Sequence, residues 1–231
     1  MTPVVVNSTR EDQERIVEII NGLPGPLAIL EAGCGRKWEL KLSVPYRLTG
    51  IDTDPDALKA RLEEKRDLDE AILGDLRTAD LTSSSYDVIY CCWVLEHVDG
   101  AEKVLENFEQ WLKPGGLLIV RVPDRDSLFG IVTRLTPFWF HVWYYRWVVG
   151  VKTAGRPGHG PYPTYYDTVI SRHGFERFCD EHRFSLIETH RVDTFVRRSV
   201  VNRILGMLVG ILSLGLVPWR WNNLTFVAQK P

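Results

Sequence analysis

The chain of 231 residues has little cysteine and lacks the cysteine spacings of a zinc site or a disulfide framework. Cys34, Cys91, Cys92 and Cys179 include an adjacent pair but no Cys-x-x-Cys, which is typical of a reducing compartment. No long apolar core follows a basic flank at the N-terminus, so we expect no secretory signal. The uncharged run at 204–217 is shorter than the roughly 20 residues of a membrane-spanning helix. These absences predict a cytoplasmic protein without a spanning segment.

Composition indicates a globular protein with an uneven charge. The hydrophobic fraction is 45% and the aromatic fraction is 11%, which is enough for a core and excludes global disorder. We expect a single domain over 1–231, because this length fits one α/β domain with insertions. The net charge is −2, but residues 146–231 carry 12 Lys and Arg against 6 Asp and Glu. The basic surplus therefore lies in the C-terminal part of the chain.

The stretch 27–36, LAILEAGCGR, predicts a buried parallel strand followed by a glycine turn and a helix. Glu31 follows the apolar residues of this strand, and Gly33 and Gly35 flank a small residue. Glycine has no Cβ, so a ligand can approach the backbone of such a turn at the carboxyl end of a sheet. A lone Gly-x-Gly is weak evidence for a nucleotide-binding loop, and its interpretation depends on the residues that follow.

Strands and helices alternate along the first half of the chain. Ser8 or Thr9 can cap a first helix, and Asp54 begins a charged helix that we expect to reach about Arg66. A further helix begins at Asp99. Further strands are predicted at 47–51, 71–73, 87–91 and 117–122. This alternation predicts a doubly wound, mostly parallel sheet.

Acidic residues occur where three neighbouring strands are predicted to end: Glu31, Asp52 and Asp75. Asp52 lies 19 residues after Gly33, the distance at which an acid after the second strand meets ribose hydroxyls. Taken singly, Asp52 could be a helix cap and Asp75 a turn residue, but three acids at consecutive strand ends favour a ligand. The sequence argues against a dinucleotide, because Trp38 stands where a dinucleotide-binding loop needs a third glycine.

Five motifs in order carry a family resemblance: ILEAGCG, LTGID, ILGDL, SYDVIYCCWVLEHV and LKPGGLLIVRVP. Through them the chain resembles the class I S-adenosylmethionine-dependent methyltransferases, in particular small-molecule enzymes similar to ubiquinone-pathway methyltransferases. The resemblance covers 27–122 and resumes at 173–188. It implies a Rossmann-like sheet of seven strands, in which the sixth (184–191) is parallel and the seventh (223–229) is antiparallel. One departure is Lys37, where many relatives have a third glycine.

The resemblance also implies a set of residues that bind S-adenosylmethionine. These are Glu31, Gly33, Cys34, Gly35, Asp52, Thr53, Asp75, Leu76, Cys91, Cys92 and His97. Glu31 is expected to orient the ammonium group, directly or through water, and Asp52 to bind the ribose diol. Asp75 is expected to bind the adenine amino group, with the Leu76 amide on a ring nitrogen. The backbone near the two adjacent cysteines would hold the amino acid end, and His97 would close over the sulfonium.

Methyl transfer from a sulfonium is an in-line displacement, in which the protein aligns the acceptor, excludes water and in some cases removes a proton. His97 is a candidate general base, because the resemblance places it at the active-site end of the sheet. Its alternative role is a structural lid, and His159, within GHGPYPTYY, is the second candidate base. No metal is expected, because relatives that bind a divalent cation have Glu-x-x-Glu-His where this chain has Trp93 in place of the first glutamate.

Two apolar insertions follow the fifth and sixth strands, at 126–166 and 192–222. Both are expected to leave the sheet at the cofactor edge. They hold five of the eight tryptophans, namely Trp139, Trp143, Trp147, Trp219 and Trp221. Arg197, Arg198 and Arg203 lie beside the uncharged run and suit anionic headgroups or a lipid phosphate. Three interpretations remain open: a substrate cap that touches a membrane, a soluble cap, and a homodimer surface.

The sequence thus favours a methyltransferase that modifies a hydrophobic or lipid-linked small molecule in biosynthesis, with oxygen chosen as acceptor on family frequency. The alternative is a binding or regulatory protein that keeps the cofactor fold without turnover. No nucleic acid partner is expected, because the chain has neither an Asn-Pro-Pro-Tyr motif nor a basic groove. We expect a cytoplasmic location, peripheral at the inner membrane face if the insertions touch lipid.

Overall fold

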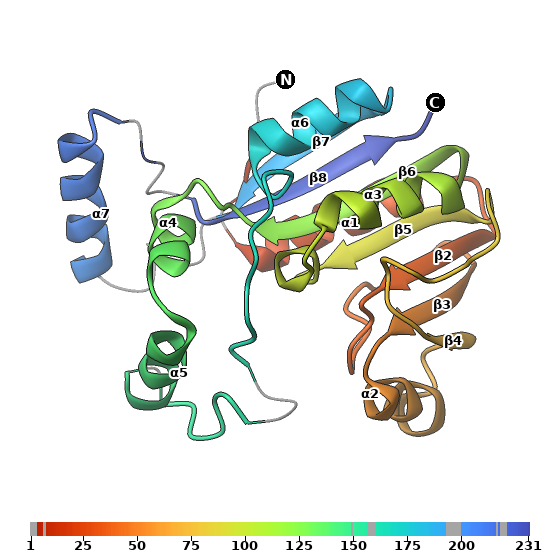
Figure 1. The fold of residues 1–231 in the computed structure, drawn as a ribbon. Coiled ribbons are helices and arrows are strands. Elements are labelled where there is room, and N and C mark those ends of the chain that lie inside the picture. Colours follow the sequence, from red (N-terminus) through yellow and green to blue (C-terminus); the bar gives the residue numbers. More distant parts are fainter. Residues whose placement is uncertain are drawn as a thin grey trace.

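A mostly parallel sheet runs through the centre of the computed structural model (Figure 1). The structure describes residues 4–6, 8–148, 150–156, 160–192, 200–215, 217 and 221–231. Within these residues the sheet has eight strands in the order β1-β7-β8-β6-β5-β2-β3-β4. The strands are β1 (Val4–Val6), β2 (Leu27–Ala32), β3 (Tyr46–Asp52), β4 (Glu70–Leu73), β5 (Tyr86–Cys92), β6 (Leu112–Pro123), β7 (Ser185–Val192) and β8 (Asn223–Gln229). All neighbours pair in parallel except β8, which is antiparallel to β6 and β7.

The predicted Rossmann-like, doubly wound α/β fold is confirmed, with one strand more than the seven expected. The additional strand is β1, which pairs in parallel with β7 from Val4↔His190 to Val6↔Val192. Of its three valines only Val6 is buried. A run of three apolar residues at the start of a chain carries no periodicity, so the sequence did not indicate this edge strand.

Helices cover both faces of the sheet. On one face lie α1 (Thr9–Asn21) and α2 (Pro55–Lys59), which continues as the π-helical segment η1 (Ala60–Lys65). On the other lie α3 (Ala101–Trp111) and α6 (Arg172–Glu181). Ser8, not Thr9, caps α1, because its Oγ accepts a hydrogen bond from the Glu11 amide at 3.1 Å. Ile16 and Ile20 turn inward from α1 and are fully buried.

A cluster of charged side chains is buried between α1 and the sheet. The Asp12 carboxylate accepts hydrogen bonds from Arg121 and from Thr225, and lies 2.6 Å from Nδ1 of His190. The other ring nitrogen of His190, Nε2, lies 2.8 Å from a Glu188 oxygen. Since both imidazole nitrogens face carboxylates, both act as donors and the ring is cationic. Burial opposes this charge, but the hydrogen bonds to Asp12 and Glu188 outweigh it and raise the pKa of His190.

The two insertions form helices that stand to one side of the sheet (Figure 1). These are α4 (Leu128–Leu135) and α5 (Phe138–Trp147), which follow β6, and α7 (Val200–Leu212), which lies between β7 and β8 in the chain. Among the described residues, no helix combines the length and the apolarity needed to cross a bilayer. His159, Arg197, Arg198 and Trp219 lie outside the described residues, and only the backbone is described for Arg203.

Candidate functional site

A cleft with a volume of about 880 Å³ opens at the carboxyl ends of β2, β3, β4 and β5. Here the strand order reverses, since β3 and β4 lie on one side of β2 and β5 on the other. Ligands of doubly wound sheets bind at such a point, and the volume is within the range of small-molecule sites. The lining includes Gly33, Gly35, Asp52, Thr53, Asp75, Leu76, Arg77, Trp93, Val94, His97, Tyr162 and Tyr165.

The glycine turn after β2 forms one wall of this cleft. Gly33 has φ +70°, and a Cβ there would lie 2.2 Å from a methyl group of Val94, so no larger residue fits without movement. Gly35 has φ +52°, and a Cβ there would meet no heavy atom within 4 Å. The Gly33 amide donates a hydrogen bond to the Ile51 carbonyl of β3 at 2.8 Å, which holds the turn against the neighbouring strand. The Gly35 backbone is therefore open to a ligand in the cleft.

Asp52 ends β3 directly beside this turn. One carboxylate oxygen accepts from the Gly35 amide at 2.8 Å, and the other accepts from the Asp54 amide at 2.9 Å. The helix-cap alternative belongs to Asp54 instead, whose Oδ1 accepts from the Asp56 amide at 2.9 Å at the start of α2. Two amides thus orient the Asp52 carboxylate, and its remaining lone pairs can accept further hydrogen bonds. Thr53 follows it along the cleft wall.

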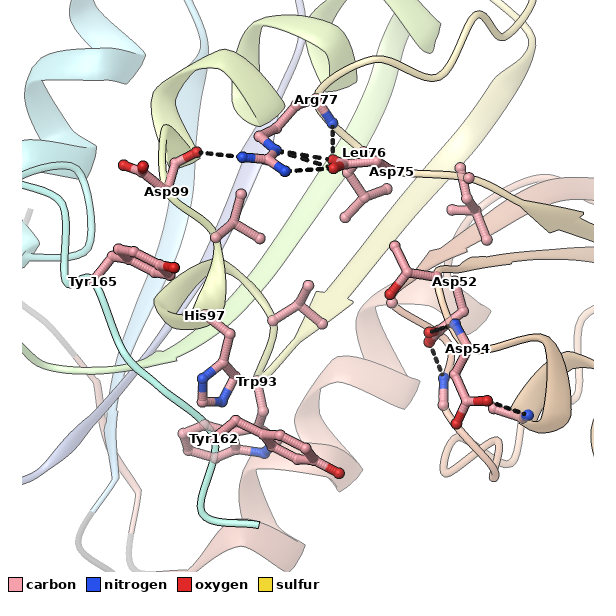
Figure 2. Close-up of a pocket in the computed structure, with 18 of the residues that line it drawn as sticks. Asp52, Asp54, Asp75, Leu76, Arg77, Trp93, His97, Asp99, Tyr162 and Tyr165 are labelled. Atoms are coloured by element: carbon pink, nitrogen blue, oxygen red, sulfur yellow. Dashed lines mark hydrogen bonds and ion pairs between the residues drawn. The ribbon is translucent and has the colours of Figure 1, made fainter. Parts of the chain in front are cut away.

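Asp75 follows β4 and is paired with Arg77 (Figure 2). The guanidinium of Arg77 lies 2.5 Å from Asp75 Oδ2, and it also donates to the Asp99 carbonyl at 3.3 Å. The hydrogen bonds that Asp75 accepts from Arg77 hold the pKa of Asp75 below its usual value. Arg77 was not anticipated from the sequence, where Asp-x-Arg after a strand is the only signal. Between the two, Leu76 is buried, and its carbonyl accepts from Asn107 at 2.8 Å.

Glu31 lies behind the glycine turn and does not line the cleft. Its carboxylate is 2.8 Å from the guanidinium of Arg61, which has no exposed surface. The same guanidinium donates to the Cys34 carbonyl at 2.6 Å and to Asp67 at 2.5 Å. Burial raises the pKa of Glu31, and the Arg61 charge opposes that shift. Glu31 and Arg61 therefore anchor the turn from beneath, and the predicted contact of Glu31 with an ammonium group stays a prediction.

The adjacent cysteines also lie outside the cleft lining, and so does the side chain of Cys34, which is buried. Cys91 is buried, and Cys92 has its sulfur 3.9 Å from the Arg121 guanidinium. The two following residues, Trp93 and Val94, reach the cleft instead, and Trp93 adopts a left-handed backbone with φ +60°. β5 continues through Cys92, one residue beyond the predicted strand, which moves the turn toward the C-terminus.

His97 lines the cleft beside Tyr162 (Figure 2). Its Nδ1 lies 2.7 Å from the Pro163 carbonyl, which can only accept, so Nδ1 carries the hydrogen and Nε2 of the neutral ring has a free lone pair. Burial lowers the pKa of His97, which favours this neutral form. Tyr162 meets the ring edge-on at 5.7 Å between centroids. Such an imidazole can accept a proton from a bound group.

Glu96 lies next to this ring on its buried side. Its Oε1 is 3.9 Å from His97 Nε2, and its Oε2 has no hydrogen-bond partner among the described residues. Burial raises the pKa of Glu96 to about 8, so the carboxyl is mostly uncharged near neutral pH. A neutral Glu96 carboxyl does not favour a positive charge on His97, so the imidazole stays uncharged as well. His159, the second candidate base, lies outside the described residues, and the expected absence of a metal stays a prediction.

Comparisons with known proteins agree with this geometry. A family model described as a methyltransferase domain matches residues 30–120. A ubiquinone biosynthesis O-methyltransferase of Rickettsia typhi is 32% identical over 116 residues, covering 46% of this chain and 46% of that protein. A probable S-adenosylmethionine-dependent methyltransferase of Mycolicibacterium smegmatis is 35% identical over 114 residues, covering 48% of this chain and 44% of that protein. The matched part thus spans less than half the length of these curated relatives.

Several solved structures match over nearly the whole chain. One is a SAM-dependent methyltransferase from Archaeoglobus fulgidus, with a TM-score of 0.57, 14% identity, and coverage of 96% of this chain and 95% of that one. At this identity the likeness shows the fold alone. Residues 30–120, which the family model matches, contain most of the residues that line the cleft, and neither insertion lies within that range.

Proposed function

We propose, from the match of residues 30–120 to the model of a methyltransferase domain, that the protein transfers a methyl group from S-adenosylmethionine to a hydrophobic or lipid-linked small molecule. One observation carries the proposal: Asp52 and Asp75, at the ends of neighbouring strands, flank one cleft that also contains the open glycine turn. Oxygen is proposed as the acceptor atom, because a relative is named as an O-methyltransferase.

The residues of the cleft fit this cofactor. Asp52, oriented by two amides, has lone pairs for a ribose diol, and the open backbone at Gly35 leaves room for the methionyl part. Asp75 keeps acceptor sites beside Arg77 for the adenine amino group, next to the Leu76 backbone. The carboxylates suit a ligand that is cationic and has no phosphate. When bound, the cofactor supplies an electrophilic methyl group on a positively charged sulfur.

The chain itself aligns the acceptor and handles its proton. Transfer to a hydroxyl group releases one proton, and we propose that Nε2 of His97 accepts it, since Nδ1–H is held by the Pro163 carbonyl. The ring is available at neutral pH because burial lowers the pKa of His97. Around it, Trp93, Tyr162 and Tyr165 give the acceptor side of the cleft an aromatic surface. Such a surface excludes water and favours an apolar acceptor.

The test is turnover with defined acceptors. The protein is incubated with S-adenosylmethionine and phenols that carry long or short apolar tails, and S-adenosylhomocysteine is measured. We expect product with the long-tailed phenols and a rate lower by about tenfold or more in Asp52→Ala, since hydrogen bonds to a charged group are lost. Asp56→Ala, an exposed aspartate of the neighbouring helix, is the matched control and should behave as the parent. Product binding without turnover on any acceptor would support a regulatory protein instead.

A further inference from the structure

Two long stretches within the insertions that follow β6 and β7 contain no acidic residue. Residues 127–166 and 194–222 together hold eight Lys and Arg and no Asp or Glu, in a protein whose net charge is −2. The eight are Arg134, Arg146, Lys152, Arg156, Arg197, Arg198, Arg203 and Arg220. The first four lie within the described residues, and all four are exposed. The insertions are thus strongly cationic, although the whole chain is slightly acidic.

The helices of these segments expose large apolar side chains. The exposed fraction is 79% for Leu135 on α4, 68% for Trp139 and 77% for Trp147 on α5, and 83% for Leu212 on α7. No residue of α5 is buried. Other exposed members are Phe129, Val132, Phe138, Trp143, Ile204, Met207, Leu208 and Ile211. Large apolar side chains exposed in this number mark a binding surface, because a folded protein normally buries such side chains.

We propose that α4, α5 and α7 form a docking surface for a bilayer that contains anionic lipid. Apolar helices with tryptophan, interspersed with Lys and Arg and without acids, are what the interface of such a bilayer attracts. α7 has 13 residues, and at about 1.5 Å per residue it is too short for a hydrocarbon core of about 30 Å. The helices therefore lie in the plane of the interface and do not cross it.

Charge distinguishes this partner from a second copy of the chain. In a two-fold dimer the same surface would face itself, which would bring two acid-free cationic surfaces together. Like charges across an interface are unfavourable and suppress such pairing. Anionic headgroups supply the missing counter-charge, and acyl chains supply the apolar environment. The observed combination of exposed apolar and basic side chains thus favours lipid over self-association.

The proposed surface is connected to the cleft. Residues 160–166, which follow α5 along the chain, place Tyr162 and Tyr165 on the cleft wall and the Pro163 carbonyl on His97. At the other end, Gly130 on α4 packs against the backbone at the end of β6, where a Cβ would lie 2.3 Å from the Asp124 carbonyl. Resting on the proposed function, the surface would bring the cleft to an acceptor that is held in the membrane.

Vesicle flotation tests the surface without any cofactor. The full chain is mixed with phosphatidylcholine vesicles with or without phosphatidylglycerol. We expect flotation only with the anionic vesicles, weakened by salt, and a loss of about tenfold or more in the double variant Leu208→Asp/Leu212→Asp. The matched control is Leu62→Asp/Leu73→Asp, two leucines that are 41% and 63% exposed away from the insertions, and it should bind as the parent does. Circular dichroism confirms that both variants are folded.

Three outcomes would overturn the proposal. They are a parent that does not float with anionic vesicles, equal binding to both kinds of vesicle, and an equal loss in the control variant. If the parent sediments as a dimer, fails to float, and becomes a monomer in Leu208→Asp/Leu212→Asp, the surface joins two subunits instead. S-adenosylhomocysteine binding in solution is measured separately, so a failure of the lipid surface and a failure of the proposed function are distinguishable.

Discussion

Charged side chains have different surroundings in the sheet and in the insertions. On the sheet side, buried cations have partners within the chain: Arg61 contacts Glu31, and Arg121 contacts Asp12. In the insertions, cations such as Arg134 are exposed, and residues 127–166 and 194–222, which hold α4, α5 and α7, have no acids. The apolar side chains differ in the same way, since Phe226 is fully buried and Trp139 is 68% exposed.

The difference separates residues that stabilise the fold from exposed residues that we propose to contact a membrane. A side chain whose contacts lie within the chain should affect the free energy of unfolding when it is changed. An exposed side chain of the insertions should leave that free energy unchanged and affect only binding. The following substitutions test this separation.

The largest contrast is expected between two aromatic truncations. Phe226→Ala removes a ring that stacks on Phe175 at 4.2 Å between centroids, and it should lower the free energy of unfolding by about 3–5 kcal/mol. Trp139→Ala removes a larger ring, but it should change the free energy of unfolding by less than about 0.5 kcal/mol, because this ring is exposed. Denaturant titration measures both. Equal losses would mean that α5 is packed as firmly as the sheet.

Removal of the buried Arg61 guanidinium beneath the glycine turn should lower the free energy of unfolding by a similar or slightly smaller amount than Phe226→Ala does. Arg61→Ala leaves Glu31 buried without its partner and should cost about 3–5 kcal/mol. It should also weaken S-adenosylhomocysteine binding, because the Cys34 carbonyl loses its anchor. Arg47→Ala breaks an exposed pair with Glu70 and serves as control, at about 0–1 kcal/mol. A loss in Arg61→Ala no larger than in this control would contradict the anchoring role.

His97→Gln distinguishes the two roles considered for His97. As general base, its loss should lower kcat by about 100-fold, and the acid limb of the parent's pH–rate profile should lie below the ordinary histidine value, because burial lowers the pKa of His97. The Kd for S-adenosylhomocysteine should change little. A structural lid would show the reverse, with weaker product binding and an unchanged profile.

The smallest effect concerns pH and the buried cluster at His190. Its pKa is raised in the folded state by Asp12 and Glu188, so the stabilisation is complete below the ordinary value of about 6.5 and is lost as pH rises through the raised value. The difference in unfolding free energy between the parent and His190→Gln should therefore shrink from about pH 6 upward. A difference that stays constant would show that His190 does not carry the charge.

The strand ends could be predicted because their signals are local. An apolar run, a turn and an acid occur within a few residues, and the structure places Asp52 and Asp75 on one cleft as expected. Partners distant in sequence could not be predicted. Arg61 lies in a stretch that reads as an exposed charged helix, and nothing near it indicates a pair with Glu31, which lies 30 residues away.

Small shifts in position account for other differences. Cys91 and Cys92 belong to β5, and the chain turns into the cleft only at Trp93, because the strand runs one residue further than predicted. The apolar character of the insertions was evident from composition. Their exposure was not, because an apolar helix of this length reads equally well as a core helix.

Isothermal titration of the full chain with S-adenosylhomocysteine tests the central claim most directly. The carboxylates at the ends of β3 and β4 should give saturable binding at one site per chain, and Asp52→Ala should weaken the affinity by about tenfold or more. An absence of heat with the parent, or an unchanged affinity in Asp52→Ala, would contradict the assignment of this cleft.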